Sequence, residues 1–229
     1  MRIAVVPARG GSKRIPKKNI RPFAGKPVIV WPIKAALSSG LFDQVIVSTD
    51  DAEIAEVARA AGASVPFVRP ENLSDDYTDT KSVIRHTISA LELDNDRDAQ
   101  VCCIYPTSVF VDAHLLSEGL EKLRGGNARF VLSVTSMDSS VYRSFSKSED
   151  DQITMLFPEN YAKRTQDLPN LYCDAAQFYW ATVGAWQSDL DIFGTNSICV
   201  FIDPSRVQDI DTESQWIAAE RIFQERSKS

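Results

Sequence analysis

Apolar and polar positions alternate along the chain with two different periods. Short apolar runs predict buried β-strands at residues 2–7, 44–49, 64–68, 99–105, 129–135, 175–183 and 197–202. Between these runs, apolar side chains recur at helical spacing, which predicts helices at residues 28–37, 51–62, 83–91, 112–124 and from 213 onward. Strands that alternate with helices favour a mostly parallel sheet with helices on both faces, so we expect an α/β, Rossmann-like fold.

One long segment interrupts this rhythm. Residues 136–175 are polar and show neither the strand nor the helix period. A stretch of this length inside a compact domain is usually functional or interfacial. The chain has 229 residues, of which 44% are hydrophobic, enough for one α/β core. We therefore predict a single domain over residues 1–229, with residues 136–175 as a small inserted arm.

Composition and charge limit the partners and the location. The chain carries 31 acidic and 25 basic residues, a net charge of −6, which argues against nucleic acid and anionic membranes as partners. We see neither a spanning apolar run of ~20 residues nor a signal peptide, so a cytoplasmic location is expected. The four cysteines and two histidines lack zinc-site spacing. Adjacent Cys102 and Cys103 are expected to be reduced and to point to opposite faces of one strand.

A cluster of cations stands out against this acidic background. The segment VPARGGSKRIPKKN, residues 6–19, directly follows the first predicted strand and contains Arg9, Lys13, Arg14, Lys17 and Lys18. In an open parallel sheet, ligands bind at the carboxyl ends of the strands. Gly10 and Gly11 let the backbone turn tightly and expose its N–H groups, which favours a polyphosphate such as a triphosphate. The segment matches neither the Walker nor the dinucleotide pattern, and a solvated charge run is the competing interpretation.

The loop ARGGSKRIPKKN resembles the signature loop of the CMP-sialic acid synthetase family, cytidylyltransferases that activate nine-carbon acidic sugars. The resemblance continues through GKPVIVWPIKAALSSGLFDQVIVSTDD, VRPENLSDD and QDIDTESQW, so it spans most of the chain. It implies a nucleotide-diphospho-sugar transferase-like fold that binds CTP, and a homodimer in which the arm reaches the partner's active site. The nucleotide-binding residues that it implies are Ala8, Arg9, Gly10, Gly11, Ser12, Lys18, Asn19, Arg69 and Thr80. Arg9 and Lys18 are also expected to act in catalysis.

A pair of aspartates near the carboxyl terminus predicts a metal site. Asp209 and Asp211 are two residues apart, so an extended backbone places both carboxylates on one face. Two hard oxygen ligands can hold Mg²⁺ while phosphate oxygens and water complete its octahedral shell. Alternatively, Asp211 favours the start of the last helix, where residues 212–215 fit a capping box. The two roles are compatible, and the resemblance implies that this D-I-D pair binds Mg²⁺ and that Asp211 takes part in catalysis.

The sugar acid is indicated by a departure from the sialic acid enzymes. Their fourth strand ends in Q-P-T-S-P, whereas this chain has YPTSV beginning at Tyr105. CCIYPTSVF and KRTQDLPNLYCDAAQFYW instead resemble the branch that activates pseudaminic acid, a relative of sialic acid with two acylamino groups. A tyrosine offers a ring and one hydroxyl in place of an amide, which suits a less polar substrate.

Further residues are expected to hold the sugar. Arg164 is the first choice for its carboxylate, because a guanidinium can bind a carboxylate with two parallel hydrogen bonds. Strand alternation places Gln177 and Tyr179 on one face, toward the sugar, and their neighbours Phe178 and Trp180 on the packing face. A strand this aromatic is also typical of an ordinary core. Asp174, which precedes the strand, is a candidate acceptor for a sugar hydroxyl.

These patterns together predict an enzyme, a nucleotidyltransferase. It would transfer CMP from CTP to the anomeric hydroxyl of a nine-carbon 2-keto sugar acid and release pyrophosphate. Pseudaminic acid is the substrate that we expect. Sialic, legionaminic and 3-deoxy-octulosonic acids stay open as alternatives, and so does a catalytically silent sensor that only binds CTP. The sequence leaves the general base undecided.

Overall fold

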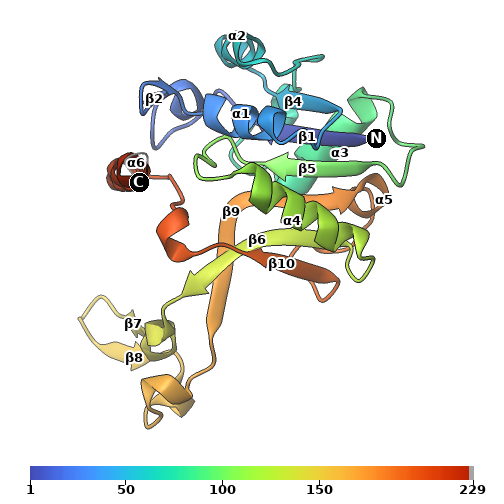
Figure 1. The fold of residues 1–229 in the computed structure, drawn as a ribbon. Coiled ribbons are helices and arrows are strands. Elements are labelled where there is room, and N and C mark those ends of the chain that lie inside the picture. Colours follow the sequence, from blue (N-terminus) through green and yellow to red (C-terminus); the bar gives the residue numbers. More distant parts are fainter. Residues whose placement is uncertain (227–229) are drawn as a thin grey trace.

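A six-stranded sheet forms the centre of the computed structural model, which describes residues 1–226 (Figure 1). Across the sheet the strands follow the order β10 (Ser197–Phe201), β6 (Phe130–Met137), β9 (Leu171–Thr182), β5 (Gln100–Ile104), β1 (Arg2–Pro7) and β4 (Gln44–Ser48). β1 is parallel to β4 and β5, and β10 is parallel to β6. Only β9 runs antiparallel to its neighbours β5 and β6. The expected mostly parallel sheet is confirmed.

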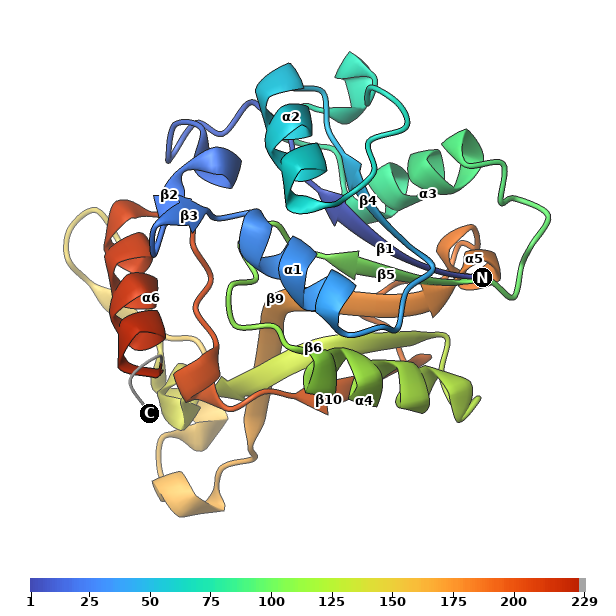
Figure 2. The same cartoon turned by 45° about the horizontal axis from the view of Figure 1, so that its top comes forward.

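Helices cover both faces of the sheet, as predicted (Figure 2). α1 (Val30–Ser38), α2 (Ala52–Ala61) and α4 (Ala113–Arg124) pack on one face, and α3 (Thr80–Ala90) and α5 (Val183–Trp186) on the other. Cys102 belongs to the first of these cores and Cys103 to the second, which confirms that adjacent strand residues point to opposite faces. Trp180 packs in the first core and Trp186 in the second.

The predicted strand at residues 64–68 is wrong. Ser64 forms only an isolated bridge with Ile46, and the chain then leaves the sheet edge. Pro66 has no N–H to continue a ladder, and Val68 ends 77% exposed. This short apolar run therefore becomes a connection that carries the chain toward the carboxyl ends of the strands.

The last helix closes the end of the molecule where the basic loop lies. α6 (Glu213–Arg226) packs on the segment that contains the short strands β2 (Pro22–Phe23) and β3 (Lys26–Pro27). Trp216 meets Phe23 edge-to-face, with ring centroids 5.6 Å apart. Burial of these rings fixes the amino end of α6, and with it the chain just before it, beside the loop that follows β1.

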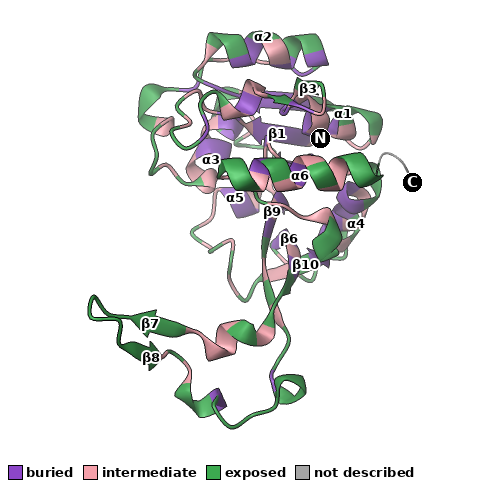
Figure 3. Ribbon diagram, turned by 90° about the vertical axis from the view of Figure 1, so that its left-hand side faces the viewer, coloured by how far each residue is buried: buried purple, intermediate pink, exposed green. Residues whose placement is uncertain are grey.

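Residues 136–175 project from the sheet (Figures 1 and 3). β6 and β9 stay paired as they leave it, up to Met137 and Leu171. Beyond them lie the antiparallel hairpin of β7 (Phe145–Lys147) and β8 (Ile153–Met155) and several short 3₁₀ turns. Much of this arm is exposed (Figure 3).

In residues 1–226 we find no helix that is both long and apolar enough to span a bilayer.

Candidate active site

The basic loop and the aspartate pair, almost two hundred residues apart in sequence, line the same pocket. The pocket has a volume of about 360 Å³ and lies where β1 and β5 end. Its lining includes Arg9, Arg14, Lys18, Asn19, Arg69, Thr80, Tyr105, Asp209 and Asp211. An adjoining hollow of about the same volume is lined by Arg9, Ser12, Lys13, Arg14, Lys18, Asn19 and Asp76. We call the two together the nucleotide pocket, after the ligand that the sequence predicts for it.

The loop holds its shape through contacts made by its backbone. Asn19 donates from Nδ2 to the carbonyl of Arg9 at 2.9 Å, and the N–H of Gly10 donates to Asp50 at 3.0 Å. A Cβ on Gly10 would lie 2.7 Å from a carboxylate oxygen of Asp51, so no larger residue fits without moving that side chain. A Cβ on Gly11 would have no neighbouring atom within 4 Å. The close approach is therefore needed at Gly10, and Gly11 leaves room beside the loop.

Two carboxylates pair with four of the cations that line the nucleotide pocket. Asp76 pairs with Arg9 at 2.6 Å and also with Lys13. Asp211 pairs with Arg14 at 2.8 Å and with Lys18 at 3.1 Å, and the Lys18 ammonium donates to the carbonyl of Ile210 at 2.8 Å.

Such partly exposed ion pairs contribute little to stability, about 0–1 kcal/mol each. The cations are therefore free to exchange a carboxylate for a phosphate at low cost.

The side chains at the aspartate pair alternate between core and pocket, as predicted. Ile210 is buried, and both Asp209 and Asp211 line the pocket. The capping box is also present, because Gln215 accepts the N–H groups of Asp211 and Thr212, each at 2.9 Å. Loss of hydration and the neighbouring Asp211 raise the pKa of Asp209.

Across residues 1–226, no three His, Cys, Asp or Glu side chains gather as a metal site. Asp209 and Asp211 offer a pair of carboxylates at the pocket, and phosphate and water would have to supply the remaining ligands. This donor set fits Mg²⁺, which usually takes one or two carboxylates beside substrate phosphates.

Arg69 is a buried cation with unused donors. It is only 4% exposed, its nearest acid is Asp50 at 3.7 Å, and its Nε and one terminal nitrogen have no hydrogen-bond partner in the protein. Burial lowers its pKa, and Asp50 partly opposes that effect. A buried guanidinium whose N–H donors lack hydrogen-bond acceptors is costly. Because Arg69 lines the nucleotide pocket, a ligand that accepts hydrogen bonds is the natural way to satisfy it.

A second pocket of about 630 Å³ adjoins the first and shares Thr78, Thr80 and Tyr105 with it. We call it the sugar pocket, after the ligand that the sequence predicts for this region. The hydroxyls of Thr80 and Tyr105 lie 2.7 Å apart, and the ring of Tyr105 meets that of Tyr179 edge-to-face at 5.5 Å. Tyr179 in turn contacts Phe193, with ring centroids 5.9 Å apart. Hydroxyls and aromatic rings, with a few charged groups at the margin, suit a sugar better than a polyphosphate.

Six residues expected at the site line neither pocket, namely Ala8, Gly10, Gly11, Arg164, Asp174 and Gln177. The side chain of Ala8 is buried in the core, and its N–H donates to Ser48. Gln177 is also buried, and its amide donates to the carbonyl of Ala175, so the expectation that it faces the sugar is wrong. Arg164 lies on the exposed arm and pairs with Asp167 at 2.8 Å. Within one chain, the structure does not bring Arg164 to the site. Phe178 and Trp180 pack in the core as expected.

Comparisons with known proteins decide the family. Residues 3–196 match the family model described as cytidylyltransferase. The chain belongs to the cytidylyltransferase family. It is 41% identical to the pseudaminic acid cytidylyltransferase of Campylobacter jejuni subsp. jejuni serotype O:2, over 92% of this chain and 90% of that protein. It is 34% identical to the CMP-N,N'-diacetyllegionaminic acid synthase of Legionella pneumophila, over 97% and 96% of the two chains.

A solved structure shares the fold. The structure of CMP:2-keto-3-deoxy-manno-octonic acid synthetase complexed with CTP superposes with a TM-score of 0.74, covering 98% of this chain and 99% of that chain. At 15% identity this similarity establishes the fold alone. The expected nucleotide-sugar transferase-like architecture is confirmed, and membership of the family makes the protein a nucleotidyltransferase.

Several residues at the pockets of this cytidylyltransferase were not predicted from the sequence. Asp76, which pairs with two loop cations, lies in the segment RPENLSDDYTDT, and nothing in its local pattern distinguishes it from a surface acid. Ala176 lines the nucleotide pocket through a backbone bulge, and Phe193 comes from the connection between α5 and β10. Neither carries a sequence signal, because their positions depend on how β9 enters the sheet.

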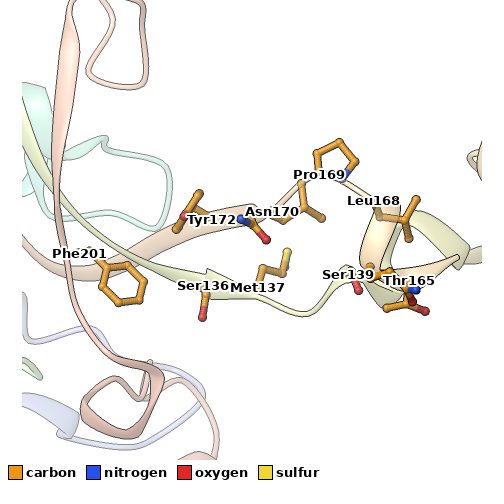
Figure 4. A pocket seen from close by; sticks show the side chains of 11 residues that line it. Ser136, Met137, Ser139, Thr165, Leu168, Pro169, Asn170, Tyr172 and Phe201 are labelled. Carbon is orange, nitrogen blue, oxygen red and sulfur yellow. The ribbon is translucent and has the colours of Figure 1, made fainter.

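A further hollow of about 430 Å³ lies at the root of the arm of this cytidylyltransferase (Figure 4). Residues at the ends of β6 and β9, and Phe201 of β10, surround it. Its lining contains hydroxyl, amide and apolar groups and no charged side chain. A triphosphate has no counter-charge there, so the hollow is separate in chemistry from the nucleotide pocket.

Proposed function

We propose that the protein transfers CMP from CTP to the anomeric hydroxyl of pseudaminic acid and releases pyrophosphate. One observation carries this proposal: the cationic loop and the aspartate pair line one pocket that adjoins a second pocket of hydroxyls and aromatic rings. The pocket pair has room for a nucleotide and an acidic sugar side by side. The 41% identity to a pseudaminic acid cytidylyltransferase supports the choice of sugar.

The loop cations would overcome the repulsion between two anionic substrates. As the triphosphate enters, Arg9 and Lys13 exchange Asp76 for phosphate oxygens, and Arg14 and Lys18 turn from Asp211 to the same ligand. Cations already placed where charge grows on the leaving pyrophosphate stabilise the transition state without a large rearrangement. Ser12 and the N–H groups near Gly11 add neutral donors.

Asp209 and Asp211 are the residues that would hold Mg²⁺. When bound, Mg²⁺ would supply positive charge that screens the charge on pyrophosphate. Breaking the ion pairs of Asp211 with Arg14 and Lys18 frees both sides. The cations can then bind the nucleotide, and the carboxylate becomes available as a metal ligand. Chelation of divalent cations should abolish pyrophosphate release, and excess Mg²⁺ should restore it.

The buried Arg69 and the Thr80–Tyr105 pair would hold the middle of the substrate assembly. Arg69 has unused donors that suit carbonyl or phosphate oxygens of the nucleotide. Thr80 and Tyr105 line both pockets, so they lie between the nucleotide and the sugar. This arrangement brings the anomeric hydroxyl beside the α-phosphate, where in-line attack requires it.

A panel of sugar acids tests the proposal. Purified protein is incubated with CTP, Mg²⁺ and pseudaminic, N,N'-diacetyllegionaminic, sialic or 3-deoxy-octulosonic acid, and released pyrophosphate is measured. We expect kcat/KM to be highest for pseudaminic acid. A higher value for the legionaminic acid would shift the assignment to the activity named for the Legionella relative. CTP binding without turnover of any acid would support a CTP sensor.

The arm supports a homodimer as part of this proposal. An isolated two-stranded hairpin is marginally stable in water. The arm also exposes several large apolar side chains, which a partner could cover: Phe145, Ile153, Leu156 and Tyr161, the last 82% exposed. A second copy is the occupant that we propose for this surface, and it would let Arg164 reach the partner's sugar pocket. Light scattering should give the mass of a dimer, and Ile153→Asp should shift it toward the monomer. The cytoplasmic location stays a prediction.

A further inference from the structure

One carboxylate at the sugar end has both oxygens committed to the protein. Asp174 lies in β9, where the pairing with β6 shifts register between Leu132 and Val134. Its Oδ1 accepts the N–H of Ala176 at 3.0 Å, and its Oδ2 accepts the hydroxyl of Tyr179. Ala176 lines the nucleotide pocket and Tyr179 lines the sugar pocket. Asp174 therefore ties the backbone of one residue at the nucleotide pocket to the side chain of another at the sugar pocket.

The backbone at this bulge needs the support that Asp174 gives. Ala176 has a φ of 49°, the left-handed region that residues with a Cβ rarely adopt. The N–H groups of Gln177 and Phe178 both turn to the hydroxyl of Ser133, each at 3.1 Å. Asp174 satisfies the remaining N–H of the bulge. The direction in which β9 leaves the bulge, and thus the place of Tyr179, depends on these side-chain acceptors.

The contact also fixes the direction of a hydrogen bond. Burial raises the pKa of both Tyr105 and Tyr179, so each phenol keeps its single proton at neutral pH. A carboxylate has only acceptors, so Tyr179 must direct its proton to Asp174. Toward Tyr105 and the sugar pocket, Tyr179 then presents oxygen lone pairs alone. The Thr80–Tyr105 pair is different, because either hydroxyl can be the donor.

We propose that Asp174 is a positioning residue that makes the Tyr179 oxygen an acceptor, so that the sugar pocket selects a substrate with an N–H or O–H group at this place. The inference rests on the proposed function and deepens it. An acylamino N–H is such a donor, whereas the carboxylate of the same sugar acid has only acceptors and would be turned away from Tyr179. Asp174 thereby sets which edge of the sugar faces the tyrosine.

Asp174→Asn separates this role from simple support of the bulge. The amide oxygen can still accept the N–H of Ala176, but the amide nitrogen then donates to Tyr179 and reverses the direction of its proton. We expect the KM for the sugar acid to rise about tenfold, the effect of one lost hydrogen bond. The KM for CTP should stay within about twofold. Asp98→Asn removes an equivalent surface charge and should change neither KM, and thermal unfolding checks that each variant is folded.

A double variant completes the experiment. In the Tyr179→Phe background, Asp174→Asn should have no further effect on the KM for the sugar acid, because the hydroxyl that it acts through is gone. A wild-type KM for the sugar acid in Asp174→Asn would overturn the inference, and so would a full additional effect in the Tyr179→Phe background. Wild-type turnover is measured first. If the wild-type protein turns over no sugar acid, both the proposed function and this inference fail. If it turns over a sugar acid and Asp174→Asn leaves the KM for that acid unchanged, only this inference fails.

Discussion

The nucleotide pocket and the sugar pocket hold their side chains in opposite ways. In the nucleotide pocket, Arg9, Arg14 and Lys18 pair with acids that are themselves partly exposed. Water screens such pairs, and they are cheap to exchange. In the sugar pocket, Tyr105 and Tyr179 are largely withdrawn from water and are fixed by hydroxyl and carboxylate partners. A buried hydrogen bond cannot be exchanged with water, so losing it costs more.

This difference suggests a division of labour. Exchangeable cations can stay paired with the phosphate oxygens from CTP binding until pyrophosphate leaves, while negative charge builds up on the pyrophosphate. Fixed hydroxyls cannot follow the ligand, but they can reject a sugar whose donors and acceptors are misplaced. We therefore expect substitutions in the nucleotide pocket to change rate and CTP affinity, and substitutions in the sugar pocket to change which acid is used.

The largest effect is expected from Asp211→Ala. This change removes a proposed Mg²⁺ ligand and the partner that keeps Arg14 and Lys18 at the pocket. Loss of such transition-state stabilisation should lower kcat/KM about a hundredfold or more. Steady-state pyrophosphate release measures it. Glu213→Gln is the matched control, because Glu213 pairs with Arg21 outside the pocket and should lose little activity. Retention of more than a tenth of wild-type activity by Asp211→Ala would contradict its role.

A smaller loss of function is expected from Arg69→Met. It should weaken CTP binding without destabilising the fold. Its buried guanidinium has two nitrogens without hydrogen-bond partners in the protein and only a 3.7 Å ion pair with Asp50, so removing it relieves a poorly compensated buried charge. The melting temperature should stay equal or rise. The KM for CTP should increase about thirtyfold, because charged hydrogen bonds to the nucleotide are lost. A lower melting temperature with normal CTP affinity would make Arg69 a structural residue. Arg59→Met, at an exposed guanidinium on α2, serves as control.

The two regions also differ in what the sequence could reveal. Much of the nucleotide pocket comes from one short segment after β1 and from the alternating pair Asp209 and Asp211, so local pattern was enough to find that part. Strand and helix periods likewise predicted most of the sheet. The exception, residues 64–68, had the right composition, but its proline and the edge of the sheet left it without a ladder.

The sugar pocket depends on topology that no local pattern contains. β9 enters antiparallel between β6 and β5, and the resulting register places Tyr179 opposite Cys103, next to Tyr105 at the end of β5. The left-handed Ala176 and the bulge beside Ser133 interrupt the alternation, so Gln177 is buried while Tyr179 lines the pocket. A strict two-residue period put both on the same face, whereas in the structure only Tyr179 lines the pocket.

An intermediate effect on sugar choice is expected from Tyr105→Gln. It replaces a ring that touches Tyr179 and a hydroxyl that bonds to Thr80 with an amide of different shape. We expect kcat/KM for pseudaminic acid to fall about tenfold, and its ratio to that for sialic acid to fall as well. Competition between the two acids in one reaction measures the ratio directly. Tyr172→Gln, on an exposed ring at the arm root, is the control. An unchanged ratio would remove Tyr105 from the specificity determinants.

The smallest effect is expected from Asp76→Asn, and its sign is the informative part. Asp76 holds Arg9 and Lys13 before the nucleotide arrives, and these cations keep its pKa low. If the carboxylate competes with phosphate for them, removing its charge should lower the KM for CTP about threefold, the scale of an exposed ion pair. Glu53→Gln breaks the equivalent pair with Lys17, which lines neither part of the nucleotide pocket, and should leave the KM unchanged. A higher KM in Asp76→Asn would mean that Asp76 helps to place the cations, and the nucleotide pocket would then be as fixed as the sugar pocket.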